Sequence, residues 1–115
     1  MAARFGAAPE LPLREQVGRA LVNKGVAFGE LGRSEEAIAV YDDVVARFGT
    51  APELQVREWV ANALVNKGNT LRQLGRSEEA ITAYQDVVTR FGAAPDPVLK
   101  ELVEGARALE ARTKT

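Results

Sequence analysis

The chain has 115 residues, of which 46% are apolar, and its 15 basic and 16 acidic side chains nearly cancel. It has no cysteine and no histidine, which excludes disulfides, thiolate and imidazole catalysis, and most zinc sites. There is no apolar run long enough to span a membrane and no basic cluster typical of nucleic-acid binding. The first six residues lack the apolar central region of a signal peptide, so we do not expect one. We therefore expect one cytoplasmic domain without a cofactor, bound to neither membrane nor nucleic acid.

The first half of the chain predicts two helices. Prolines at positions 9 and 12 suit a first helical turn, because the missing N–H has no helical partner there. Apolar or small residues then recur three or four apart: Leu13, Val17, Leu21, Gly25, Phe28 and Leu31. Gly32 should end this helix in the left-handed conformation. Ser34 should then cap a second helix that runs to Phe48, with two glutamates in its first turn.

The second half repeats this pattern. Thr50 is a candidate cap, and Pro52 should open a long helix to Leu74 with a stripe of Val56, Val60, Leu64, Gly68 and Leu71. Ser77 should cap the next helix, which runs to Phe91. Pro95 and Pro97 then open a fifth helix, expected over 96–112. No segment alternates with the period of a strand, so we expect no sheet.

These elements form an internal repeat. Residues 6–48 align without a gap with residues 49–91, and 28 of the 43 positions are identical. Helix pairs that repeat in register stack into an α-solenoid, so the expected fold is all-α, with repeats at 6–48 and 49–91. Residues 92–115 should form a polar capping helix, because Glu104 and Arg107 stand where the second repeat has Ala61 and Leu64.

The repeated residues resemble the tetratricopeptide repeat. The second copy carries the resemblance through Leu64-Val65-Asn66-Lys67-Gly68, Leu71, Gly75, Ala80, Tyr84 and Phe91. The first copy matches through Leu21, Gly25, Phe28, Gly32, Ala37, Tyr41 and Phe48. The unit here is nine residues longer than the family's usual one, which indicates a long-unit class of about 42–43 residues. The mid-helix glycines, Gly25 and Gly68, indicate a close helix approach, where we expect Ala37 and Ala80 to meet them.

The resemblance implies a concave face, lined by the first helix of each unit, that holds a partner's peptide or helix. Carried over by position, the lining residues of the first unit are Arg19, Val22, Asn23, Val26, Gly29 and Glu30. Those of the second unit are Asn62, Val65, Asn66, Asn69, Arg72 and Gln73. Residues 26–30 and 69–73 differ at all five positions, which suits either specialisation for partners or drift on an exposed surface.

The asparagine that both units keep and the single tryptophan each have two possible roles. Asn23 and Asn66 can bond to a partner's peptide groups or to an adjacent helix. Trp59 is a candidate binding residue, or it packs between neighbouring long helices. The Asn–Lys–Arg carboxylate clamp of some family members is not expected, because Leu109 and Gly105 stand where basic residues would be needed.

Three classes of function follow, of which enzyme catalysis is the weakest, because no nucleophile, base or metal-ligand cluster is present. The first is a non-enzymatic scaffold that binds a protein or peptide, in a segment of a longer array. The second is a self-associating solenoid segment. In that case a homodimer or a head-to-tail stack would form through the first helix, where Leu13 and Val17 would be partly uncovered beside Phe5.

Overall fold

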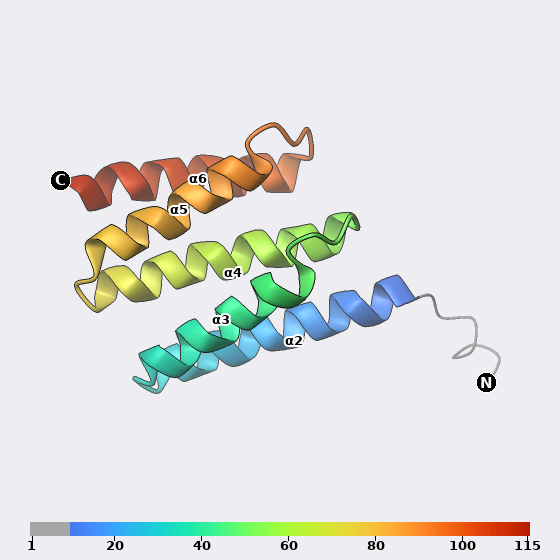
Figure 1. Ribbon diagram of the computed structural model, residues 1–115, viewed down its shortest axis with the longest axis horizontal. Helices are drawn as coiled ribbons and strands as arrows, with labels where there is room; N and C mark the ends of the chain where they lie inside the picture. Colours follow the sequence, from blue (N-terminus) through green and yellow to red (C-terminus); the bar gives the residue numbers. More distant parts are fainter. Residues whose placement is uncertain (1–9) are drawn as a thin grey trace.

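The computed structural model describes residues 10–115 and confirms the all-α fold (Figure 1). Phe5 and Pro9 lie outside the described residues. The five helices are α2 (Glu10–Glu30), α3 (Ser34–Phe48), α4 (Leu54–Gln73), α5 (Ser77–Phe91) and α6 (Pro97–Lys114). Between residues 10 and 115 there is no strand, and no helix is both long and apolar enough to cross a membrane.

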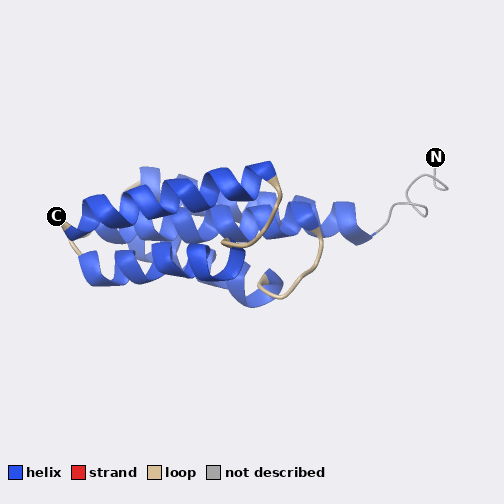
Figure 2. Ribbon diagram, turned by 90° about the horizontal axis from the view of Figure 1, so that it is seen from above, coloured by secondary structure: helices blue, strands red, loops and turns tan. Residues whose placement is uncertain are grey.

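The helices stack as two antiparallel pairs followed by a single helix. Each helix packs against its neighbour in the chain, and α4 also contacts α2 on one side and α6 on the other. The α2–α3 and α4–α5 turns lie at one end of the molecule, and the other two connections lie at the opposite end (Figures 1 and 2). The first helix of each unit therefore lies beside the first helix of the next, as in stacked tetratricopeptide-type pairs.

Helix α4 occupies the centre of the core. Its predicted stripe of Val56, Val60, Leu64, Gly68 and Leu71 is buried throughout, because the helix has neighbours on both sides. The second helices bury matching residues: Ala37, Ile38, Tyr41 and Val44 in α3, and Ala80, Ala83, Tyr84, Val87 and Phe91 in α5. Helix α6 buries Leu99, Val103 and Ala106, whereas Glu104 and Arg107 are exposed.

The stripe predicted for the first helix is only partly covered, as expected for Leu13 and Val17. Leu13 is 61% exposed and Leu31 is 69% exposed, and Val17 is only half-buried. The residues that α2 does bury include Gly18, Val22 and Gly25. The cause is position rather than pattern, because among the described helices α2 has neighbours on one side only. The same spacing of apolar residues that is fully covered in α4 is therefore left half-covered at the edge.

The mid-helix glycines do mark a close helix approach, but the partner is not the expected alanine. A Cβ placed on Gly68 would lie 2.5 Å from Cε1 of Tyr84, and one placed on Gly25 would overlap the ring of Tyr41 in the same way. Both tyrosines are almost fully buried. The tyrosine ring of the second helix thus packs directly against the glycine backbone of the first, which no larger residue than glycine permits without displacement.

The expected serine caps are also wrong. Arg33 and Arg76 occupy the N-cap positions, and no side-chain hydrogen bond caps α3 or α5. The turns are too short for a separate cap. Gly32 has φ +78°, and the N–H of the following residue, Arg33, already donates to the carbonyl of Phe28 at 2.8 Å. The residue that completes the helix C-terminus is therefore also the one that begins the next helix.

The start of α4 differs from the prediction as well. Neither Thr50 nor Pro52 opens the helix, which begins at Leu54 after an extended Glu53. The chain needs the intervening residues to reverse direction after α3. The fifth helix begins as expected at Pro97 and extends to Lys114, and Asp96 caps it by accepting from the N–H of Leu99 at 2.9 Å.

The tyrosine–glycine contact predicts that Gly68→Leu destabilises the fold even though leucine favours helix. Leucine gains about 1 kcal/mol in helix propensity, but overpacking against the rigid Tyr84 ring typically costs about 1–3 kcal/mol or more. Gly105→Leu is the matched control, because nothing lies within 4 Å of a Cβ at Gly105. Urea denaturation should show a lower midpoint for the first variant and a higher one for the second. Equal stabilisation of both would contradict the role given to Gly68.

Candidate functional site

A groove of about 360 Å³ lies between the first helices of the two units. Helix α2 contributes one wall, helix α4 the other, and a tyrosine of α3 also lines it. The lining residues are Val26, Gly29, Glu30, Tyr41, Asn66, Asn69, Thr70 and Gln73. A volume of this size lies within the range of small-ligand and peptide-residue sites.

The groove brings together some of the residues predicted to line a binding face. Val26, Glu30, Asn66, Asn69 and Gln73 all line it, together with Gly29. The other candidates do not line this groove: Arg19, Asn23, Asn62, Val65, Arg72 and Trp59. The residues that converge come from the C-terminal half of each first helix. These are largely the segments 26–30 and 69–73, in which the two units differ at every position.

Two predicted residues belong to the interior instead. Val22 is 3% exposed and is part of the core, so its assignment to a lining surface is wrong. Trp59 is half-buried and packs against the core. A Cβ on Gly18 of α2 would lie 3.4 Å from the Cβ of Trp59. The tryptophan therefore fills the space between the two long helices, in agreement with the packing interpretation.

The amide side chains of the groove have unused hydrogen-bonding capacity. Within the described part of the chain, neither Asn66 nor Asn23 forms a side-chain hydrogen bond, so the alternative of a bond to an adjacent helix is not found. Asn62 differs, because its Nδ2 donates to the carbonyl of Glu58 at 3.0 Å in its own helix. Thr70 is occupied too, since its hydroxyl donates to the carbonyl of Asn66. Asn66 can therefore donate to and accept from a ligand.

The two buried tyrosines differ at their hydroxyl groups. The hydroxyl of Tyr84 donates to Oδ1 of Asn69 at 2.6 Å. The residue equivalent to Asn69 in the first unit is Val26, which cannot accept. No described residue bonds to the hydroxyl of Tyr41, which is 2% exposed and lines the groove. Burial raises the pKa of the Tyr41 hydroxyl above its ordinary value, so it stays a protonated donor at neutral pH.

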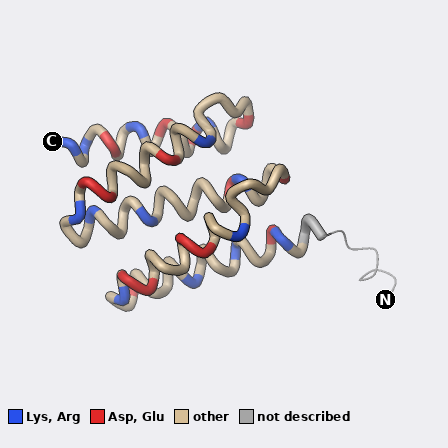
Figure 3. Tube along the Cα trace, viewed as in Figure 1, with Lys and Arg blue, Asp and Glu red and all other residues tan. Residues whose placement is uncertain are grey.

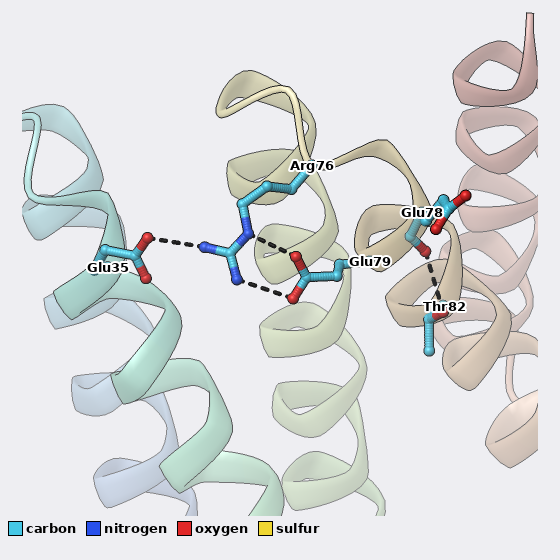
Figure 4. A network of polar contacts seen from close by, with 5 residues as sticks. All are labelled: Glu35, Arg76, Glu78, Glu79 and Thr82. Carbon is cyan, nitrogen blue, oxygen red and sulfur yellow. Dashed lines mark hydrogen bonds and ion pairs between the residues drawn. The ribbon is translucent and has the colours of Figure 1, made fainter.

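Polar side-chain contacts join the second unit to the first. Arg76 lies between Glu35 of α3 and Glu79 of α5 (Figure 4), with Nη1 2.8 Å from Glu35 and Nε 2.6 Å from Glu79. The hydrogen bond from Arg76 is the main cause that lowers the pKa of Glu79. Lys67 lies 2.6 Å from Asp42. One unit later, the equivalent positions hold a hydrogen bond of 2.9 Å from Gln85 to Glu110.

The remaining electrostatics give no sign of a catalytic or metal centre. Basic and acidic residues are interspersed along the trace, without a region of one sign (Figure 3). In residues 10–115 no three carboxylates gather in a way that could hold a metal ion. The glutamates at the start of α3 and α5 pair with arginines of the preceding turn rather than with each other. The groove is therefore suited to binding, with amides, two hydroxyls and one carboxylate.

From the sequence, Tyr41 was named only among the residues that carry the resemblance and was not predicted to line the groove. A comparison of the two repeats could have identified Tyr41. Tyr41 and Tyr84 are identical, whereas the residue after each mid-helix glycine changes from Val26 to Asn69. A buried tyrosine that keeps its hydroxyl but loses its acceptor in one copy marks a polar group open to another partner.

The difference between the tyrosines predicts unequal costs for the same substitution. Tyr84→Phe should lower the free energy of unfolding by about 1 kcal/mol, because it removes a hydrogen bond and leaves Asn69 without its donor. Tyr41→Phe should leave the free energy of unfolding nearly unchanged, since no described residue depends on that hydroxyl. Urea denaturation followed by circular dichroism measures both. Equal losses in the two variants would contradict this description of the groove.

Comparison with known proteins supports the repeat assignment. The family model described as "Tetratricopeptide repeat" matches residues 2–52 and residues 22–97. No match was found among curated proteins or among solved structures. The matched ranges together cover most of the chain and include both helix pairs. The chain therefore belongs to the tetratricopeptide repeat family, whose members are typically non-catalytic scaffolds for protein interaction.

Proposed function

We propose that this protein is a non-enzymatic scaffold that binds a peptide or protein segment in the groove between α2 and α4. The family implies an interaction scaffold in general terms. Two observations support this groove as the site. Six of the residues selected from the resemblance line one hollow, and several of its polar groups have no partner among the described residues. Unpaired amide side chains on a surface can donate hydrogen bonds to the backbone of an extended segment and accept hydrogen bonds from it.

We also infer that the chain represents a long-unit class of the family. The 43-residue period supports this, because the helices of the two units begin and end 43 positions apart in α3 and α5. The first helix of the second unit, α4, has 20 residues, whereas the second helix, α5, has 15. The additional length therefore falls on the first helices, which form the two walls of the groove.

A variant that fills the groove without disturbing the fold tests the proposed site. Gly29 lines the groove, and nothing lies within 4 Å of a Cβ built on it. Gly29→Arg, which introduces the residue found at the equivalent position 72, should therefore fold at least as stably as the original chain. Peptides selected from a random library on the unmodified protein should bind this variant at least about tenfold more weakly by calorimetry, a loss of about 1.4 kcal/mol.

Gly105→Arg is the matched control, because it adds the same side chain to an exposed position of α6 outside the groove. This variant should bind the selected peptides as the original chain does. If the library gives no binder, or if its binders tolerate Gly29→Arg, the groove is not the binding site.

A second candidate, self-association through α2, is favoured by a different observation. Leu13 is 61% exposed on that helix. Arg33 pairs with Glu36 of its own unit, whereas its equivalent, Arg76, also reaches an acid of the preceding unit. Another copy placed against α2 would cover the leucine and could supply an acid to Arg33. A closed two-fold dimer is the commoner arrangement, and a head-to-tail stack is the alternative.

Leu13→Glu tests self-association with little risk to folding, because the side chain is already exposed. The mass of the unmodified chain in light scattering should rise with concentration, and this variant should remain a monomer. Leu74→Glu, at a leucine 41% exposed after the end of α4, is the matched control and should associate like the original. A chain that stays monomeric at high micromolar concentration would exclude this candidate.

A further inference from the structure

The two units differ in how the hydroxyl of their buried tyrosine is bonded, and this difference bears on what the groove binds. In the second unit the tyrosine of the second helix is satisfied, because Tyr84 donates to Asn69 of the first helix. In the first unit the ring of Tyr41 lies on Gly25 in the same way, but Val26 replaces the acceptor. A buried hydroxyl without a partner is costly, and it is usually paired with protein, water or a ligand.

The unpaired hydroxyl lies where a ligand can reach it. Tyr41 is 2% exposed as a residue, yet it lines the same hollow as Val26, Asn66 and Asn69. Among the described residues, the side-chain polar atom that is fully enclosed and has no hydrogen-bond partner is Oε1 of Glu53. The Tyr41 oxygen also has no partner, so it is not fully enclosed. The hydroxyl is therefore held rigidly by its ring and remains accessible through the groove. A donor fixed in this way loses little freedom when it binds an acceptor.

The charge of the groove indicates which side chains it would accept. Glu30 is the one ionisable carboxylate or ammonium group among the eight lining residues, and it forms no ion pair with a described residue. The other polar lining groups are the amides of Asn66, Asn69 and Gln73 and the hydroxyls of Thr70 and Tyr41. A negative charge beside neutral hydrogen-bonding groups favours a cationic side chain and disfavours an acidic one.

We propose that the groove between α2 and α4 binds a basic peptide segment, in which a carbonyl oxygen accepts a hydrogen bond from the hydroxyl of Tyr41 and a lysine or arginine side chain lies beside Glu30. This inference rests on the proposed function and specifies its ligand. The amides of Asn66 and Gln73 hold the neighbouring peptide groups. The second unit lacks this donor, because Tyr84 is already bonded to Asn69, and this restricts recognition to the first unit.

The test uses the full chain and a library of random peptides displayed on phage, with one enriched peptide synthesised for titration. The enriched peptides should be rich in lysine and arginine. Tyr41→Phe should weaken binding of that peptide about two- to tenfold, the effect of losing one hydrogen bond. Tyr84→Phe is the comparison variant, because it removes the equivalent hydroxyl from the second unit and frees Oδ1 of Asn69, and it should weaken binding less than Tyr41→Phe does at a temperature well below its unfolding transition. Glu30→Gln should weaken binding and reduce its dependence on salt.

Val26→Asn provides an independent measurement. It installs in the first unit the acceptor that Asn69 provides in the second, so Tyr41 should bond to it. The variant should then unfold at the same or a higher temperature and bind the peptide more weakly. Val26 is 38% exposed, and valine and asparagine differ little in helix propensity, so the exchange itself should disturb little.

The outcomes separate this inference from the proposed function. If Gly29→Arg weakens peptide binding but Tyr41→Phe and Val26→Asn do not, the role of Tyr41 is overturned and the groove remains the binding site. Enrichment of acidic peptides would overturn the role of Glu30. If no recovered peptide binds Gly29→Arg more weakly than the original chain, the proposed function and this inference are overturned together.

Discussion

The spacing of the two helices in each unit is set by a tyrosine ring that lies against a glycine. The ring is large and nearly fully buried, and the glycine is the one residue whose backbone leaves room for it. The contact occurs twice, at Tyr41 with Gly25 and at Tyr84 with Gly68. Because both copies keep the same pair, the same close contact joins the first and second helices in both units. The groove exists because two such helices lie side by side.

The repeat, the five helices and the glycine approach could be predicted from the sequence, because each depends on neighbours within one unit. Hydrophobic spacing located the buried face of α4 correctly, since α4 has a neighbour on each side. The equally regular spacing in α2 did not bury Leu31, and Leu13 is exposed as expected for a helix at the edge of the stack. Spacing shows which side of a helix is apolar, but burial depends on whether another helix is there to cover it.

Caps and site residues were harder to predict for a related reason. Ser34 and Ser77 have the right chemistry for a cap, but a turn of two residues leaves the cap position to arginine. For the groove, position within the family's unit correctly grouped Val26, Asn66 and Gln73. It also included Val22, which is buried, and Arg19 and Arg72, which lie outside the lining. The lining depends on how far one unit is rotated against the next, and no local pattern encodes that angle.

Ion pairs join the first and second units at the surface, and they include Arg14 of α2 with Glu53 at 2.8 Å. Arg76 of the second unit reaches back to Glu35, and Lys67 reaches back to Asp42. Each pair is exposed and contributes at most about 1 kcal/mol, so these pairs add little to stability. They do distinguish one stacking register from another, because a shift by one helical turn would separate both pairs at once. Register decides which residues of α2 and α4 face each other across the groove. The hydrophobic core holds the helices together, and the polar pairs add a weak preference for the register in which Val26 and Glu30 line one groove with Asn66, Asn69 and Gln73. A groove defined in this way can change its ligand through a few wall residues, as residues 26–30 and 69–73 differ here, without any change in the core.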